Sequence, residues 1–182
     1  GGFDVVGSSY NRAIQALRMI GDLRRDLTAP IVVFSYANPL LRCGIGEFAR
    51  RAADAGVDGV LALDLPIEEA VDVHDTLAGA GIDMIFLLSP TTTDARIKRA
   101  AELGSGFLYG ISRLGVTGAR DQVSSSAGEM VRRIRPHTAL PIALGFGVSR
   151  PEHVAEIGVY ADAAVVGSAL VSVIAKESAT TE

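Results

Sequence analysis

Three short glycine-containing segments follow apolar stretches in the second half of the chain: Gly115–Gly118 (GVTG), Gly145–Gly147 (GFG) and Gly167–Ser168 (GS). Glycine lets the backbone come close to a ligand and present its amide N–H groups to an anion. A helix that begins directly after Gly167–Ser168 would add the positive end of its dipole. Each glycine taken alone fits an ordinary turn or cap, but the three together favour a site for a phosphate ester.

Other chemically useful side chains follow the same kind of apolar stretch. Asp64 lies at the end of an apolar strand-like run, in the segment LALDLP. It could bind a hydroxyl group or act as a base, with a helix cap or a loop hydrogen bond as the alternative. Tyr109 could lean over an aromatic substrate or close the core. Arg113, in the loop that follows, fits a loop anchor better than a ligand contact.

The side chains that could hold a metal stand apart from one another. The three histidines fall on helix faces or in a turn, and Cys43 is the only cysteine. A single cysteine excludes an internal disulfide and a cysteine-cluster metal site. The sequence therefore predicts no metal centre, and it contains neither a GxGxxG nor a Walker motif for nucleotides.

The elements that must position these residues alternate regularly along the chain. Continuous apolar runs, typical of strands covered on both faces, predict strands at 30–37, 59–65, 83–89, 106–112, 140–146 and 163–169. Segments with apolar residues three or four apart predict helices at 10–27, 46–56, 66–81, 94–104, 126–137 and 150–158. Alternating strands and helices with short connections predict a parallel sheet.

Two α/β architectures fit this order, an open doubly wound parallel sheet and a (β/α)8 barrel that lacks some of its units. The 182 residues favour the open sheet, because a barrel typically needs about 250 residues. In both architectures ligands meet the carboxyl ends of the strands. No linker divides the sequence, so we expect residues 1–182 to form a single domain.

The overall composition excludes several classes of protein. The net charge is −4 and the basic residues are scattered, which argues against a nucleic-acid surface. Hydrophobic residues make up 48% of the chain without a run long enough to span a bilayer, and no signal peptide opens it. We expect a globular protein of the cytoplasm.

Taken in order, the motifs resemble those of the tryptophan synthase alpha subunit family. The resemblance runs from about Pro30 to about Ile174 and includes PIVVFSYANPLL, ALDLPIEEA, IFLLSPTTTDARI, GFLYGISRLGVTGAR, LPIALGFGVSRPEHV and ADAAVVGSALV. It implies a (β/α)8 TIM barrel, present here as about six βα units, and so favours the barrel over the open sheet.

The resemblance also implies an activity. The family cleaves indole-3-glycerol phosphate to indole and glyceraldehyde 3-phosphate, a retro-aldol lyase reaction in tryptophan biosynthesis. It works with a beta subunit that carries pyridoxal phosphate and joins the indole to serine. The resemblance implies no cofactor in the alpha chain itself and a heterotetramer with the beta subunit.

Site residues carry over from the resemblance position by position. The phosphate would be held by Gly118, Gly147, Gly167 and Ser168. The indole pocket would be lined by Phe34, Leu61, Leu87, Tyr109, Thr117, Phe146 and Val165. Asn38, Asp64 and Pro66 would lie near the rim that faces the partner, with Asp64 coupling the two active sites. Arg113 and Thr117 would belong to a closing loop, and Tyr109 and Asp64 would act as auxiliary groups.

The sequence departs from the family pattern in its first part. The two catalytic carboxylates of the family lie in a segment resembling E-x-G-x-P-F-S-D-P-x-x-D-G-P, and no such segment stands before Pro30. The sequence enters the barrel in or just before the family's second helix. Since each general acid or base contributes about 10²–10⁴-fold, we expect at best trace lyase activity from this chain alone.

Two alternatives to a member of the enzyme family follow. The chain could be a non-catalytic phosphate-binding module that docks on a beta subunit, or a different phosphate-binding barrel or open-sheet enzyme. A barrel without two strands also exposes two strand edges, so we expect oligomerisation, a rearranged sheet or a partner that fills the gap.

Overall fold

The computed structural model describes residues 5–111, 120–145 and 147–180, with side chains described over 11–111, 127–145 and 147–177. The described residues form two compact units. Unit 1 consists of the residues up to Phe86 together with Leu103–Gly106, and unit 2 consists of Leu87–Glu102 together with the residues from Phe107 onward.

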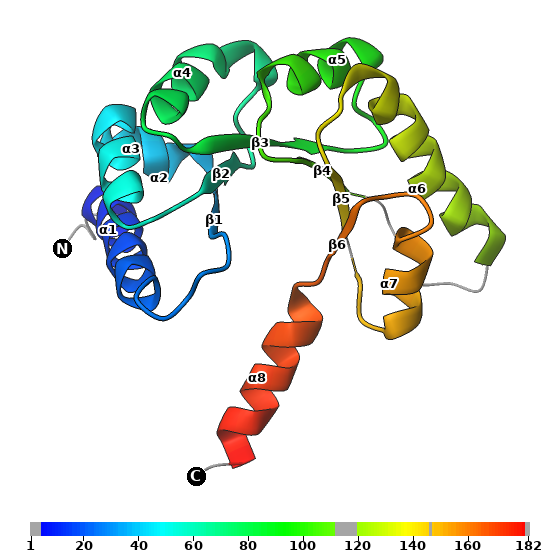
Figure 1. Cartoon of the computed structure of the whole chain (residues 1–182). Coiled ribbons are helices and arrows are strands. Elements are labelled where there is room, and N and C mark those ends of the chain that lie inside the picture. Colours follow the sequence, from blue (N-terminus) through cyan, green and yellow to red (C-terminus); the bar gives the residue numbers. More distant parts are fainter. Residues whose placement is uncertain (1–4, 112–119, 146, 181–182) are drawn as a thin grey trace. The chain divides into compact units, whose positions relative to one another are not determined.

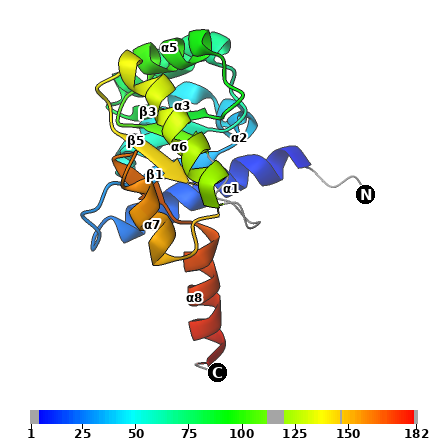
Figure 2. The same ribbon diagram turned by 90° about the vertical axis from the view of Figure 1, so that its right-hand side faces the viewer.

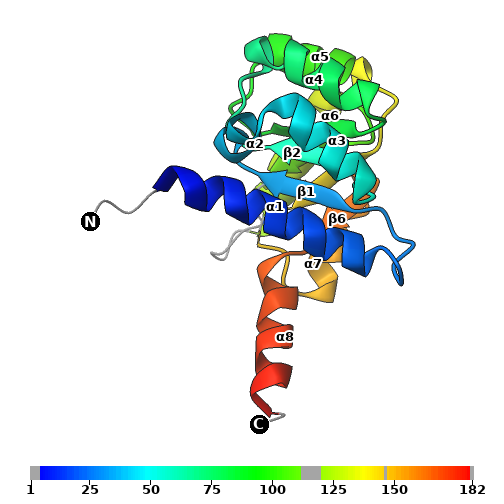
Figure 3. The same ribbon diagram turned by 90° about the vertical axis from the view of Figure 1, so that its left-hand side faces the viewer.

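Unit 1 is built on a row of parallel strands (Figure 1). The strands are β1 (Val32–Ser35), β2 (Gly59–Ala62) and β3 (Asp83–Leu88), in that order, and the last two residues of β3 belong to unit 2. The helices are α1 (Val5–Leu23), α2 (Ala37–Cys43), α3 (Ile45–Asp54) and α4 (Val71–Gly79), with a 3-10 turn η1 (Ile67–Glu69). Figure 3 shows α1 and α3 on the same side of β1 and β2.

The core of unit 1 lies between these helices and strands. Phe48 of α3, Leu61 of β2, Leu77 of α4 and Ile85 of β3 are its largest fully buried side chains. Full burial of such a side chain stabilises a fold by about 1.5–3 kcal/mol. The apolar faces of the helices thus cover the apolar runs of the strands.

Unit 2 repeats this arrangement. Its parallel strands are β4 (Leu108–Ile111), β5 (Ile142–Gly145) and β6 (Ala163–Val165), in that order. Its helices are α5 (Asp94–Leu103), α6 (Arg120–Ile134), α7 (Pro151–Ile157) and α8 (Ser168–Thr180), with a 3-10 turn η2 (Arg135–His137) (Figure 2). Leu108, Met130, Ile142, Leu144 and Ile157 form the centre of its core.

The amino-terminal ends of the strands are held by the same contact in both units. In unit 1, Arg24 forms an ion pair with Asp58 and donates to the Ala29 carbonyl at 2.6 Å. Asp58 Oδ2 also accepts the Ile31 N–H at 2.7 Å. The Asp58 N–H returns a bond to the Ile31 carbonyl at 2.9 Å. We call this set of contacts the Arg24–Asp58 clasp.

The corresponding contact in unit 2 is the Arg135–Asp162 clasp. Arg135 forms an ion pair with Asp162 and donates to the Leu140 carbonyl at 3.1 Å, while Asp162 Oδ2 accepts the Ile142 N–H at 2.8 Å. In both clasps the arginine stands six residues before a proline, Pro30 or Pro141, that opens the strand segment. Two contacts lower the pKa of each aspartate: the hydrogen bond from the backbone N–H has the larger effect, and the arginine has the smaller one.

The expected strands and helices are found, with shorter strands than predicted. Two helices lie outside the predicted helical ranges: α8, which begins at Ser168 within the strand predicted at 163–169, and α2. α2 covers Ala37–Cys43, in a segment that the sequence assigns to the end of a strand and a loop. Pro39 near its first turn is compatible with a helix start, but its cap comes from a distant residue, described below.

Candidate functional site

The carboxyl ends of β5 and β6 bring two of the predicted glycine segments together. Gly145 of β5 pairs in register with Val165 of β6. Gly147 and Gly167 each stand two residues after a member of this pair, so both follow the carboxyl ends of neighbouring strands. The strand pairing therefore places the GFG and GS segments where a single ligand could meet both.

The three glycines of this region differ in their surroundings. A Cβ atom at Gly145 would lie 2.7 Å from Val165 Cβ and 2.9 Å from the Val165 carbonyl oxygen, closer than packed atoms allow. At Gly147 and Gly167 a Cβ would meet no atom within 4 Å. Gly145 is thus required for strand packing, whereas the other two border open space. Gly147 also has a φ of +71°, which favours glycine.

Helix α8 begins at this edge. Its first residue is Ser168, and the Gly167 carbonyl accepts the N–H groups of Leu170 at 3.0 Å and Val171 at 3.3 Å. The first amide N–H groups of a helix have no partner within it and carry the positive end of its dipole. An anion at the open side of Gly167 would therefore face these donors.

Tyr109 lies against the same strand ends. It pairs in register with Ala143 on β5, and its hydroxyl would be 2.9 Å from a Cβ at Gly145. The ring therefore leans toward the carboxyl end of β5, next to the Gly145–Val165 pair. Burial raises the pKa of the Tyr109 phenol, so it stays neutral at physiological pH.

Unit 1 holds other predicted pocket residues on its own strands. Phe34 of β1 pairs in register with Leu61 of β2, and Leu61 with Ile85 of β3. Residues in register share a face of the sheet. Leu87, near the end of β3, belongs to unit 2. Leu61 is buried, whereas the Phe34 side chain is 56% exposed.

Asp64 has a defined structural partner. Its Oδ1 accepts the Ala37 N–H at 2.6 Å, so the loop after β2 caps the first turn of α2. Asp64 thus acts as a helix cap, one of the alternatives that the sequence left open. The helix that it caps, α2, follows β1, whereas Asp64 itself follows β2. Asn38 lies in that first turn and accepts from Arg42 Nε at 3.0 Å, and Pro66 precedes the 3-10 turn η1. The capping bond joins the loops after β1 and β2.

Some predicted residues lie outside the described part of the chain. Arg113, Thr117, Gly118 and Phe146 fall within residues 112–119 or at 146. The closing loop and the GVTG segment therefore stay predictions. In unit 2 the described candidate residues are those of the β5–β6 edge and Tyr109; in unit 1 they are Phe34, Leu61, Asn38, Asp64 and Pro66.

Sequence analysis missed one residue that holds a loop at a strand end. Arg133 of α6 donates to the carbonyls of Pro90 at 3.1 Å and Thr92 at 2.6 Å, and to Asp94 Oδ1 at 2.7 Å. These bonds fix the loop between β3 and α5. Arg133 is one of several arginines in α6, and nothing in the sequence marks it for this role, because its acceptors are mostly backbone carbonyls.

Metal ligands, a reactive thiol and a membrane span are the other features to consider among the described residues. Within residues 5–111, 120–145 and 147–180, no three His, Cys, Asp or Glu side chains group as metal ligands. Burial raises the pKa of the Cys43 thiol, and burial outweighs the nearby Arg51 that lowers it. In that same part of the chain, no helix has both the length and the apolar character to cross a membrane.

Comparison with known proteins gives a consistent match. The family model described as tryptophan synthase alpha chain matches residues 7–182. The tryptophan synthase alpha chain of Carboxydothermus hydrogenoformans is 43% identical over 160 residues, which are 88% of this chain and 60% of that relative. The alpha chain of Methanosarcina barkeri is 49% identical over 150 residues, which are 82% of this chain and 56% of that relative.

Solved structures support the same assignment. A chain of the tryptophan synthase α2β2 complex from Pyrococcus furiosus has a TM-score of 0.80 and 38% identity, covering 88% of this chain and 65% of that chain. The A-subunit from the same organism has a TM-score of 0.79 and 33% identity, covering 96% of this chain and 67% of that chain.

The chain thus spans about six tenths of the length of the curated relatives it matches. The fold class that the motifs favoured, an incomplete (β/α)8 barrel of parallel strands with alternating helices, is confirmed over the open doubly wound sheet. The chain belongs to the tryptophan synthase alpha chain family.

Proposed function

We propose that this chain binds the phosphate and the indole of indole-3-glycerol phosphate, the substrate of aldol cleavage to indole and glyceraldehyde 3-phosphate. The observation that supports the proposal is the register of β5 and β6: Gly147 and Gly167 each follow two residues after the Gly145–Val165 pair, and α8 begins at Ser168. Membership of the family adds the substrate class. The edge combines open space with several amide donors, which a phosphate dianion requires.

In this proposal the donors hold the phosphate and the aromatic and aliphatic side chains receive the indole. The Tyr109 ring lies next to Gly145, so the ring and the phosphate donors stand at neighbouring positions of the same strands. Gly118, Thr117 and Phe146 complete the proposed site from the segments after β4 and β5. A neutral phenol suits an apolar indole, because no charge has to be buried.

Cleavage breaks the bond between the indole ring carbon and the glycerol chain. One group must protonate the ring carbon while another takes the proton of the glycerol hydroxyl. Those steps belong to the carboxylate segment of the family, which these 182 residues lack. We therefore propose that this chain alone has at most trace lyase activity and contributes binding, with Tyr109 and Asp64 as auxiliary groups.

The partner in this proposal is a tryptophan synthase beta subunit. One solved relative comes from an α2β2 complex. In unit 1, Tyr36 and Leu41 are 62% and 49% exposed on or next to α2, which also carries Asn38, and Asp64 ties α2 to the next loop. A beta subunit seated on α2 would therefore sense any movement of the Asp64 loop. Co-purification with the Pyrococcus furiosus beta subunit tests this, and a chain that elutes alone would contradict it.

The phosphate site is tested by calorimetric titration with indole propanol phosphate, a substrate mimic. We expect Gly167→Ala to weaken binding by at least about tenfold, since a methyl group would occupy the space of the phosphate. Gly79→Ala is the matched control, because a Cβ there also meets nothing within 4 Å but lies on α4. No binding by the unmodified chain at millimolar ligand, or equal binding by both variants, would refute the proposal.

A further inference from the structure

His153, the third residue of α7, lies between two groups that can only donate hydrogen bonds. Its Nδ1 faces the backbone N–H of Ser149 at 3.3 Å, and its Nε2 faces the guanidinium of Arg150, with Nε at 3.2 Å and Nη2 at 3.1 Å. A backbone N–H and a guanidinium offer no lone pair to an imidazole. Both ring nitrogens of His153 therefore stand where an acceptor is needed.

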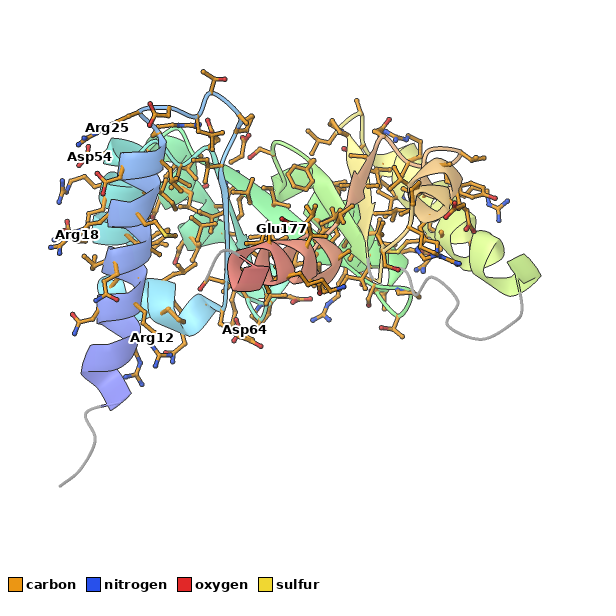
Figure 4. All side chains as sticks on the ribbon, turned by 90° about the horizontal axis from the view of Figure 1, so that it is seen from below. Arg12, Arg18, Arg25, Asp54, Asp64 and Glu177 are labelled. Carbon is orange, nitrogen blue, oxygen red and sulfur yellow. The ribbon has the colours of Figure 1, made fainter. Side chains whose placement is uncertain are left out.

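The contact between Arg150 and His153 is a feature of this position, because an exposed arginine need not lie against an imidazole. Figure 4 shows Arg18, for example, extending outward from α1. Arg150 is exposed as well, yet its guanidinium folds back onto the first turn of α7. A positive charge on the ring would therefore lie directly against a second positive charge.

The contacts of His153 depend on the protonation state of its ring. A neutral imidazole has one lone pair, so at any moment it accepts from Ser149 or from Arg150. A protonated imidazole has two N–H groups and no lone pair, so it accepts from neither and repels the Arg150 guanidinium. Imidazole is the side chain that changes charge between about pH 5 and 8. Acidification in this range therefore removes the bond to Ser149.

The other charged groups around α7 leave this chemistry to Arg150 and His153. On α7 itself, Glu152 and Glu156 flank His153, and neither forms an ion pair with it among the side chains that the structure describes. Helix α7 packs on β6, whose residues Ala163–Val165 carry no titratable side chain. α6 lies beside α7 in Figures 1 and 2, and its described charged side chains are paired, Arg132 with Glu129 and Arg133 with Asp94.

The bond from Ser149 to His153 holds the segment that carries Gly147. Ser149 stands two residues after Gly147, and Val148 between them is buried, with 3% of its surface exposed. The segment is thus fixed by the Val148 side chain and, one residue later, by the imidazole of His153. Donors that are already fixed in place bind a ligand more tightly, because less conformational freedom is lost on binding.

We infer that His153 is a positioning residue for the phosphate site: its neutral ring holds Ser149, and through it the Gly147 amide, and protonation of the ring releases both and weakens phosphate binding. The inference rests on the proposed function, because it needs a phosphate at Gly147. The charge of a protonated ring would by itself favour an anion. The loss of the bond and the gain of the charge have opposite signs, so a measurement can separate them.

The test is calorimetric titration with indole propanol phosphate at about pH 8 and about pH 5.5. The phosphate also takes up a proton in this range, so variants are compared only at the same pH. His153→Gln is the conservative variant, because glutamine is a capping acceptor at this helix position and does not titrate. The unmodified chain should match it within about twofold at the higher pH and bind at least about threefold more weakly at the lower pH.

Two further variants complete the comparison. His153→Ala should bind at least about threefold more weakly than His153→Gln at both pH values, because it lacks the acceptor at either pH. His74→Gln, on α4 in unit 1, is the matched control for the loss of a histidine and should follow the unmodified chain at both pH values. Without any ligand, the Ser149 amide should exchange at least about threefold faster in His153→Ala than in His153→Gln at the same pH.

Three results would overturn the inference: an unchanged affinity ratio between the unmodified chain and His153→Gln at the two pH values, tighter binding by the unmodified chain at the lower pH, or equal Ser149 exchange in the two His153 variants. If the unmodified chain binds at about pH 8 and one of these results is found, this inference alone falls. If neither the unmodified chain nor any variant binds at that pH, the proposed function is refuted and the inference falls with it.

Discussion

Gly145→Ala should destabilise unit 2 strongly, although it adds a single methyl group. The new Cβ would lie 2.7 Å from Val165 Cβ, 2.9 Å from the Val165 carbonyl oxygen and 2.9 Å from the Tyr109 hydroxyl. A side-chain tip can move away, but the Val165 backbone is fixed by its register with Gly145. Overpacking of this kind costs typically about 1–3 kcal/mol, and a backbone contact places this case at about 2 kcal/mol or more.

The assay is urea unfolding followed by circular dichroism and tyrosine fluorescence, because the chain has no tryptophan. Gly167→Ala is the control in the same unit, with open space at its Cβ, and should stay within about 0.5 kcal/mol of the unmodified chain. Adding Tyr109→Phe to Gly145→Ala should recover only part of the loss, since it removes one of the close contacts. Equal stability of the Gly145→Ala and Gly167→Ala variants would refute the reasoning.

Three further predictions concern the clasp, the cap and the loop anchor. The hydrogen bond from the Ile142 N–H, and to a smaller extent the Arg135 guanidinium, lowers the pKa of Asp162. The stability that ionised Asp162 contributes is therefore complete at neutral pH and is lost as the pH falls through its folded-state pKa. Asp162→Asn should flatten this acid dependence, measured by urea unfolding at several pH values. Asp64→Ala should cost about 1 kcal/mol by uncapping α2, with faster amide exchange at Ala37, and unchanged exchange there would contradict the cap. Arg133→Lys should cost about 1–2 kcal/mol in the same unfolding assay, because a lysine ammonium cannot reach all the acceptors that Arg133 contacts in the loop between β3 and α5. Unchanged stability would show that this loop does not depend on Arg133.

Strand and helix periodicity predicted most of the fold. The apolar runs indicated the six strands of the described sheet, and Gly147 and Gly167 each stand two residues after the paired Gly145 and Val165. Local patterns work here because the inner strands β2, β3 and β5 are mostly buried, and the apolar faces of the helices must cover them. The different roles of two nearby glycines could not be predicted, because nothing local distinguishes Gly145, which strand packing requires, from Gly147, which borders open space.

Long-range contacts could not be predicted. α2 is capped by Asp64, and a cap that comes from another loop leaves no trace in the helix's own sequence. The two clasps do share a spacing, with an arginine six residues before a proline, but their aspartates stand 34 and 27 residues away from the arginines. A sequence pattern reports neighbours along the chain, and these bonds join residues that only the tertiary fold brings together.

The most direct test of the central claim is an amide chemical-shift map of the chain titrated with indole propanol phosphate. We predict that the largest shifts fall on Gly147, Gly167 and Ser168, where the β5–β6 edge meets the start of α8, while Gly79 on α4 stays unchanged. Largest shifts at residues away from this edge, with Gly147, Gly167 and Ser168 unmoved at saturation, would contradict the account.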